Sequence, residues 1–271
     1  MKLSNVVCTL CVLLFLPLVS THAHASDGVT EWTIDGDKRT AMIVAPAKKT
    51  DGPVPVVLVF HGHGGTIKSC MEMFNLQKDW PEALVVYPQG LPTATGHESA
   101  GKESGWQQKI GTNNDRDLKF VDAILKDLGE KYPIDTKRIF ATGHSNGGMF
   151  SYLMGMTRSK TFAAIAPSAA VVSGLGADKE ARPVPVLHFA GKSDTVALFE
   201  NQMKSMDAVR KRNQCEAEGT AWATVGDLVA TLYPSKVGAP FVSAVFPGGH
   251  TYPDGATELI VRFFKEQTQA K

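Results

Sequence analysis

One pentapeptide constrains the fold of this chain more than any other feature of its sequence. Residues 143–147 read Gly-His-Ser-Asn-Gly, follow a short expected strand at residues 138–142 and precede an expected helix. This pattern is typical of a sharp strand-to-helix turn, which only small neighbours of the serine permit. The turn lifts the serine hydroxyl clear of the sheet, and the first turn of the helix offers unpaired backbone N–H groups. The sequence therefore predicts that Ser145 is a nucleophile.

Strands and helices alternate along the rest of the chain. Runs of apolar residues predict strands, and apolar positions at helical spacing predict helices. We expect strands at residues 30–34, 40–45, 54–60, 83–87, 138–142, 162–166, 184–190, 228–233 and 241–246, and helices at residues 66–78, 115–131, after Asn146, 198–211 and 256–266. A long loop is expected at residues 88–114. This order predicts a mostly parallel sheet with an antiparallel N-terminal edge and helices on both faces. Together with the serine turn at residues 143–147, it predicts an α/β-hydrolase fold.

The first 25 residues have the features of an export signal. Lys2 precedes an apolar stretch, and residues 23–25 read Ala-His-Ala, which has the form of a signal-peptidase site. A buried N-terminal helix is the alternative. We therefore expect a signal peptide at residues 1–25, a single catalytic domain at residues 26–271, and a secreted or periplasmic location.

Charge and residue spacing exclude several classes of partner. Without Lys2, the 28 basic residues fall to 27 and equal the 27 acidic ones. A net charge of zero argues against a nucleic acid or an anionic membrane as the main partner, whereas a neutral ester or a polysaccharide fits. Outside the expected signal, which contains His22 and His24, no pair of histidines has metal-ligand spacing with a carboxylate, and no glycine-rich phosphate loop is present. We predict no metal and no cofactor.

A serine hydroxyl needs a base and an acid to become a nucleophile, and in this fold both follow the serine along the chain. Asp194 and His250 each follow an expected strand at its C-terminal end. We predict that Asp194 orients His250 and that His250 accepts the proton of Ser145. The alternatives are a helix N-cap for Asp194 and a surface loop histidine for His250.

A second glycine-rich segment follows the expected strand at residues 54–60. Residues 61–65 read His-Gly-His-Gly-Gly, which is similar to segments that donate a backbone N–H to an oxyanion. We predict donors at Asn146 and near His63 and Gly64, with a plain strand-to-helix turn as the alternative. Outside the expected signal, Cys70 and Cys215 remain. They either form a disulfide or stay separate thiols.

These motifs together resemble secreted esterases similar to poly(3-hydroxybutyrate) depolymerases and to feruloyl or acetylxylan esterases, the carbohydrate esterase family 1 group. The segments that carry the resemblance are FHGHGG (60–65), VVYPQG (85–90), GW (105–106), DRDLKFVDAIL (115–125), RIFATGHSNGGM (138–149), AAIAPSAA (163–170), HFAGKSD (188–194), RKRNQC (210–215) and PGGHTYP (247–253). The resemblance implies the same triad and the same oxyanion segment. It also suggests that Trp106 lies near the substrate cleft, although a core position stays open. His144 and Gln89 are further candidates for substrate contact.

The expected activity is hydrolysis of carboxylic esters through an acyl-serine intermediate. Feruloyl or acetyl esters of plant polysaccharides and short hydroxyalkanoate polyesters are the expected substrates, and aryl esters and synthetic polyesters are further candidates. The alternatives are a serine peptidase and an acyl-transferring or binding protein on the same fold.

Overall fold

The computed structural model describes residues 27–48, 50–172, 175–176 and 180–268. The predicted signal segment at residues 1–25 lies outside the described residues. None of the described helices is long and apolar enough to cross a membrane.

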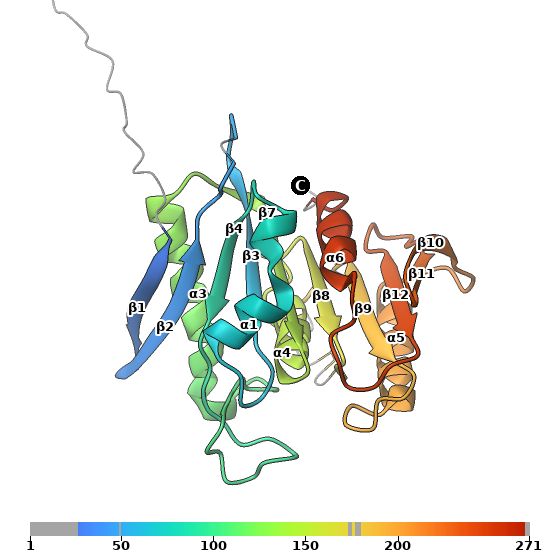
Figure 1. Cartoon of the computed structure of the whole chain (residues 1–271), viewed down its shortest axis with the longest axis horizontal. Coiled ribbons are helices and arrows are strands. Elements are labelled where there is room, and N and C mark those ends of the chain that lie inside the picture. The colour runs from blue at the N-terminus through green and yellow to red at the C-terminus, as the bar shows by residue number, and fades with distance from the viewer. Residues whose placement is uncertain (1–26, 49, 173–174, 177–179, 269–271) are drawn as a thin grey trace, which may run out of the picture.

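A ten-stranded sheet forms the centre of the molecule (Figure 1). Its six central strands, from β4 to β12, run parallel to one another, and an antiparallel pair extends the sheet at each edge. The order across the sheet is β1 (Gly28–Ile34), β2 (Asp37–Val44), β4 (Leu84–Pro88), β3 (Val54–Phe60), β7 (Ile134–His144), β8 (Ala164–Ser168), β9 (Val186–Gly191), β12 (Phe241–Phe246), β11 (Leu228–Tyr233) and β10 (Thr220–Val225). The predicted α/β-hydrolase architecture is confirmed.

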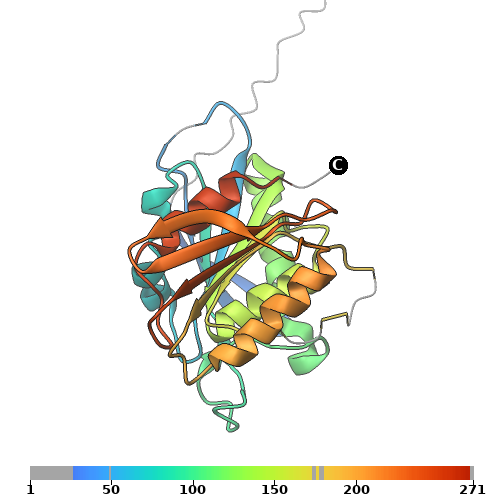
Figure 2. The ribbon, with the colours of Figure 1, turned by 90° about the vertical axis from the view of Figure 1, so that its right-hand side faces the viewer.

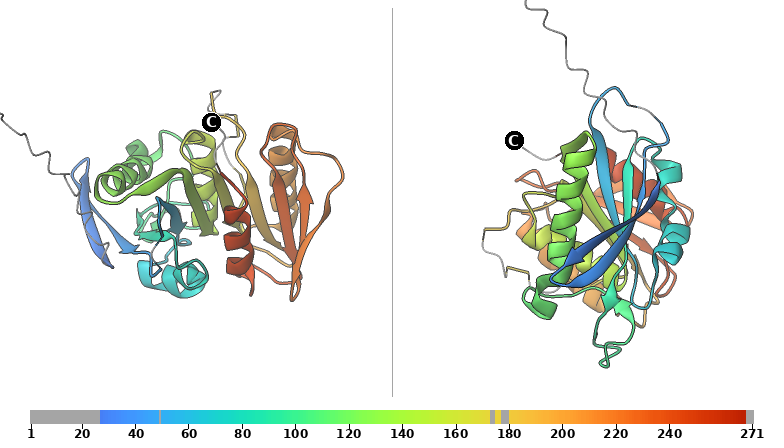
Figure 3. Two further views of the ribbon diagram at one scale, coloured as in Figure 1. Left: turned by 90° about the horizontal axis from the view of Figure 1, so that it is seen from above. Right: turned by 90° about the vertical axis from the view of Figure 1, so that its left-hand side faces the viewer.

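Helices cover both faces of the sheet, as predicted (Figure 3). One face carries α1 (Ile67–Phe74), α2 (Leu76–Asp79) and α6 (Ala256–Lys265), and the other carries α3 (Arg116–Lys131), α4 (Asn146–Thr157) and α5 (Phe199–Arg212). Each helix layer forms a separate hydrophobic cluster with its face of the sheet. Because both faces are covered, every residue of β3 and of β4 is buried, which explains their continuous apolar sequences.

The antiparallel N-terminal edge is confirmed by the pairing of β1 with β2. The antiparallel edge at the other side, formed by β10 and β11, was not predicted (Figure 2). Strand β10 was missed because four of its six residues are alanine or threonine, which gives a weak apolar signal. The Gly226–Asp227 turn that follows it is a hairpin signal that could have identified the strand.

Two regions differ from the predicted elements. The helix expected at residues 66–78 is interrupted at Asn75, whose φ of 41° is left-handed, so α1 and α2 are separate helices. The loop expected at residues 88–114 contains a small two-stranded sheet, formed by β5 (Leu91–Pro92) and β6 (Ser104–Gly105). This small sheet fixes the position of Trp106, the residue that follows β6.

The disulfide considered between Cys70 and Cys215 is absent, and both cysteines are free. Cys70 belongs to the hydrophobic cluster formed with α1, α2 and α6. Cys215 packs against the cluster on the opposite face of the sheet. The sheet therefore separates the two thiols, and no bridge can form without unfolding.

Candidate active site

Ser145 lies between β7 and α4 in a strained backbone conformation. Its φ of 56° and ψ of −121° are unusual for a residue other than glycine. A Cβ atom on Gly147 would overlap the carbonyl oxygens of Phe60 and His61. The turn can pack against the end of β3 only because Gly147 has no side chain, and this contact accounts for the second glycine of the pentapeptide.

The three residues predicted as a triad lie in hydrogen-bond contact. The Oγ atom of Ser145 is 2.9 Å from Nε2 of His250. The Nδ1 atom of His250 is 2.9 Å from Oδ2 of Asp194. These residues lie at the carboxyl ends of β7, β9 and β12, so the parallel strands bring together side chains that are up to 105 positions apart in the sequence. This arrangement allows a proton to pass from Ser145 to His250 while Asp194 fixes the imidazole tautomer.

The carboxylate of Asp194 accepts four hydrogen bonds in a fully buried position. The backbone N–H groups of Val196 and Ala197 donate to Oδ1 at 2.9 Å each. The side-chain amide of Gln202 donates to Oδ2 at 3.0 Å, beside the bond from His250. Asp194 is not the N-cap of α5, because the cap position is Leu198 and no side chain caps it.

Two backbone N–H groups beside Ser145 have no acceptor among the described residues: those of Asn146 and His63. Asn146 begins α4, where the N–H groups of the first turn are free. The predicted donor at Gly64 is wrong, because its N–H donates to the Ser104 carbonyl at 2.7 Å. Of the two donors predicted in the 61–65 segment, only His63 therefore has a free N–H.

The side chain of Asn146 holds the segment that follows β6. Its Oδ1 accepts from the N–H of Trp106 at 2.7 Å, and its Nδ2 donates to the Trp106 carbonyl at 3.0 Å. The indole N–H donates to the His61 carbonyl at 2.9 Å, and the ring packs on Phe60 and Phe150. Trp106 has no exposed surface. The predicted substrate contact of Trp106 is therefore wrong, since the residue belongs to the core and supports the turn from below.

Gln89 also lies away from the reacting atoms. Its Oε1 accepts from the N–H of Ile67 at 3.0 Å, and its Nε2 is 3.1 Å from Nε2 of His61. The same His61 nitrogen accepts from the N–H of Gly90 at 2.9 Å. Gln89 lines neither of the cavities that contain Ser145. It fastens the start of α1 to the end of β4, and the predicted substrate contact is wrong.

His144 packs against His250, with 5.1 Å between the ring centroids. Its Nδ1 is 3.2 Å from the hydroxyl of Ser168. Burial and, to a smaller extent, charge repulsion from the nearby His250 together lower the pKa of His144 to about 4. A neutral His144 imidazole adds no positive charge next to His250 near neutral pH. His144 also lines one cavity at Ser145, where it can contact a ligand.

Two cavities meet at Ser145, and both are lined by Ser145, His63 and His250. One has a volume of about 220 Å³ and extends toward α1, where it reaches Cys70 and Met73. The other has a volume of about 150 Å³, and its further lining is Thr95, His97, Gln108, Asn146, Met149, Val196 and Ala197. An ester whose carbonyl lies at Ser145 can place its two halves in these two cavities.

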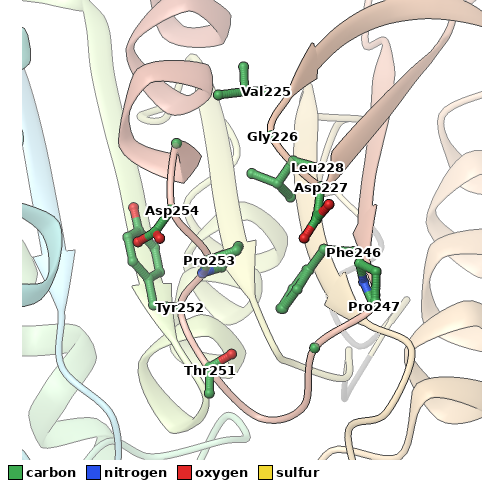
Figure 4. Close-up of a pocket in the computed structure, with 12 residues that line it drawn as sticks. Val225, Gly226, Asp227, Leu228, Phe246, Pro247, Thr251, Tyr252, Pro253 and Asp254 are labelled. Atoms are coloured by element: carbon green, nitrogen blue, oxygen red, sulfur yellow. The ribbon is translucent and has the colours of Figure 1, made fainter.

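A wider hollow of about 530 Å³ lies beside the loop that carries His250. Figure 4 shows that its lining comes from the β10–β11 turn and from the segment that joins β12 to α6. Neither Ser145 nor His250 lines it, so this hollow is separate from the reacting atoms. Among the described residues, no group of three or more His, Cys, Asp or Glu side chains is arranged to hold a metal ion.

Sequence analysis missed three buried residues that extend the site. Gln202 contacts Asp194, His188 contacts Gln202, and Tyr152 contacts His188. Gln202 and Tyr152 lie inside helices whose sequence patterns indicate only a buried face. The available signal was His188, a polar residue within the apolar strand β9.

The fold and the site together define the class: an α/β-hydrolase fold that carries a serine, a histidine and an aspartate in hydrogen-bond contact. The chain is similar to two groups of curated proteins. It is 32% identical over 66% of its length to a probable feruloyl esterase C of Aspergillus flavus, and 33% identical over 55% of its length to a bifunctional acetylxylan esterase/xylanase of Neocallimastix patriciarum. The chain spans 63% and 21% of those relatives, respectively. The predicted resemblance to feruloyl and acetylxylan esterases is confirmed.

Two further comparisons concern the fold and the region around the turn. The acetyl xylan esterase from Aspergillus awamori superimposes with a TM-score of 0.66 at 16% identity, covering 88% of this chain and 99% of that one. Residues 93–182, about a third of the chain, match the prolyl oligopeptidase family. That match includes Ser145 but neither Asp194 nor His250.

Proposed function

We propose that this chain is a carboxylic-ester hydrolase that works through an acyl-serine intermediate on Ser145. The hydrogen bonds that join Ser145, His250 and Asp194 carry the proposal. His250 accepts the serine proton as the hydroxyl attacks the ester carbonyl, and Asp194 stabilises the imidazolium. His250 then protonates the departing alcohol, and water repeats the sequence on the acyl-enzyme.

The N–H groups of His63 and Asn146 are the proposed oxyanion donors. Neither N–H has an acceptor among the described residues, and both residues line a cavity together with Ser145. The dipole of α4 favours negative charge at its N-terminus, where Asn146 lies. Donors that are already in place stabilise the tetrahedral intermediate without reorganisation during the reaction.

The proposed substrates are feruloyl or acetyl esters of plant polysaccharides, with short hydroxyalkanoate polyesters as a further class. The names of the similar proteins favour feruloyl and acetyl esters. The two cavities at Ser145 are smaller than the roughly 300–1,000 Å³ of sites that enclose a drug-sized ligand. A small acyl group fits such a site while the rest of a polymer stays outside. We further propose that residues 26–271 form one catalytic domain that is exported, which gives access to an extracellular polymer.

Hydrolysis assays test this function directly. The wild type should cleave p-nitrophenyl acetate, methyl ferulate or acetylated xylan, and Ser145→Ala should reduce kcat by about 10⁴-fold or more. Ser99→Ala, which changes an exposed serine, is the matched control and should retain full activity. Equal rates for wild type and Ser145→Ala on every ester would contradict the proposal.

A serine peptidase is the second candidate because residues 93–182 match the prolyl oligopeptidase family. The triad serves both reactions, so only the substrate distinguishes them. Peptidyl p-nitroanilides should remain intact under conditions in which the esters are cleaved. Transfer of the acyl group to an added alcohol would identify acyl transfer as a further activity.

A further inference from the structure

A continuous chain of buried hydrogen bonds extends from Asp194 into the core. Gln202 Nε2 donates to Asp194 Oδ2 at 3.0 Å. Gln202 Oε1 lies 3.1 Å from His188 Nε2, and His188 Nδ1 lies 2.6 Å from the Tyr152 hydroxyl. Gln202, His188 and Tyr152 have no exposed surface. Their polar groups therefore depend on one another, because no water reaches them.

Only one arrangement of protons satisfies every member of this chain. Ionised Asp194 only accepts, so the amide nitrogen of Gln202 must face it and the amide oxygen must face His188. His188 must then carry its proton on Nε2, and Nδ1 accepts from the Tyr152 hydroxyl. Burial lowers the pKa of His188 to about 4, so the ring is neutral near pH 7 and this tautomer persists.

The chain also joins the elements that carry the triad. Tyr152 lies two turns along α4, the helix that begins directly after Ser145. His188 lies on β9, which ends just before Asp194, and Gln202 lies on α5, which follows it. The distance between nucleophile and acid is therefore set through buried side chains as well as through the backbone.

We propose that Gln202, oriented by His188 and Tyr152, is a positioning residue that holds the Asp194 carboxylate in the rotamer that faces His250. The proposal rests on the proposed function. Val196 and Ala197 fix Oδ1 through their N–H groups, and Gln202 fixes Oδ2 at the oxygen that His250 also uses. Without Gln202, one of the two side-chain bonds to this oxygen is lost and the carboxylate can rotate.

Removing the Gln202 donor also changes the proton affinity of His250. The charge on Asp194 Oδ2 would then be stabilised less by the protein and would attract the His250 imidazolium more strongly, so the protonated form of His250 is favoured in the variant. The other titratable groups around His250 are His144 beneath it and, lining the two cavities with it, His61, His63, His97 and Cys70. These groups are the same in the wild type and in the variants, so they do not account for a shift.

The test compares Gln202→Leu with wild type on p-nitrophenyl acetate across the pH range. We expect kcat to fall about tenfold to a hundredfold, because a hydrogen bond to a charged group is lost. KM should change little, and the acid limb of kcat/KM should move to higher pH. Tyr152→Phe removes only the hydroxyl at the far end of the chain of hydrogen bonds. It should lower kcat and move the acid limb of kcat/KM in the same directions, but by less. This second variant keeps the proposal testable if Gln202→Leu does not fold.

Asn213→Ala is the matched control. Asn213 is a fully buried amide at the end of the same helix, and it donates to the carbonyls of Val184 and Ala239. It should lower stability without moving the acid limb. If folded Gln202→Leu and Tyr152→Phe retain the wild-type kcat and acid limb, the proposal is wrong.

Different results would contradict the proposed ester hydrolysis and the positioning role of Gln202. A wild-type chain that neither hydrolyses esters nor reacts with a fluorophosphonate contradicts the proposed function. The His250 imidazole can still be titrated by NMR in that case. An unchanged His250 titration in Gln202→Leu would overturn the positioning role, and an upward shift would support it.

Discussion

The side-chain amide of Asn146 is paired with the backbone of Trp106 through two hydrogen bonds, at 2.7 and 3.0 Å. Asn146 thus uses its side chain for structure and leaves its backbone N–H free beside Ser145. The pairing joins the first residue of α4 to the segment that follows β6. The proposed oxyanion donor is therefore held by a buried contact with Trp106.

Asn146→Ala tests this dual use. The substitution keeps the backbone N–H but leaves two buried groups of Trp106 unpaired, which should lower the free energy of unfolding by about 1–3 kcal/mol for each. We also expect kcat to fall by about tenfold, because the N–H is held less rigidly. Urea unfolding and ester hydrolysis measure the two effects. Asn201→Ala, at an exposed position of α5, should change neither. An unchanged kcat in a measurably destabilised Asn146→Ala would separate the pairing from catalysis.

Gly147→Ala should disrupt the turn. The added Cβ would overlap the Phe60 and His61 carbonyl oxygens, which belong to backbone that cannot move aside. We expect a loss of at least about 3 kcal/mol in unfolding free energy, at the upper end of overpacking effects. Gly52→Ala is the control because a Cβ there meets nothing within 4 Å. Equal stabilities of the two variants would show that the turn tolerates a side chain.

A buried ion pair supports the segment that carries Trp106. Asp117 Oδ1 accepts from Arg39 at 2.9 Å, and Asp117 Oδ2 accepts from the N–H of Gln107 at 2.8 Å. Both charged side chains are fully buried. Asp117→Ala leaves Arg39 unpaired and should cost about 3–5 kcal/mol of stability.

Asp122→Ala is the matched control on the same helix. Asp122 forms an ion pair with Arg158 at 2.7 Å, but its side chain is 47% exposed. The loss in the free energy of unfolding of Asp122→Ala should therefore stay within about 1 kcal/mol. Urea unfolding of both variants measures the contrast. Comparable losses would mean that burial does not set the strength of the Arg39 pair.

The stability of the chain should fall in mild acid because of His144 and His188. Burial lowers the pKa of each to about 4, from 6.5. The unfolded chain therefore binds more protons between these values, so stability is complete above pH 6.5 and decreases as the pH falls toward 4. The loss is at most about 3 kcal/mol for each histidine.

Urea unfolding at several pH values checks this dependence. His188→Gln removes one of the two titrating groups, and its stability should vary less between pH 6.5 and 4 than that of the wild type. His97→Gln changes an exposed histidine and should follow the wild-type curve. A wild-type curve that is flat across this range would contradict the prediction.

The alternation of strands and helices and the position of Ser145 followed from the sequence because they depend on local patterns. Continuous apolar runs mark strands that are buried on both faces, as in β3. The approach of His250 and Asp194 to Ser145 could also be anticipated, since parallel strands place their carboxyl ends at one edge. A weak apolar pattern hid β10, because this edge strand contributes few residues to the core.

The roles of Trp106, Gln89 and Gly64 could not be predicted because they depend on contacts between distant segments. Trp106 is buried against Phe60 and Phe150, and only the folded chain brings these rings together. Gly64 fits the donor pattern, yet the carbonyl of Ser104 occupies its N–H. A motif identifies which groups a segment can offer, whereas the partners of those groups are set by packing.

The two cysteines should behave as separate thiols of unequal reactivity. Cys70 is 2% exposed, and burial raises the pKa of its thiol well above the usual range. Cys215 is only partly buried, and burial raises its thiol pKa as well. Because the thiolate is the reactive form, iodoacetamide should modify Cys215 first and Cys70 only after unfolding. Peptide mass spectrometry should find both cysteines alkylated in denaturant without reductant, and a reductant should leave the melting temperature unchanged. Recovery of a peptide that links Cys70 to Cys215 would contradict their separation by the sheet.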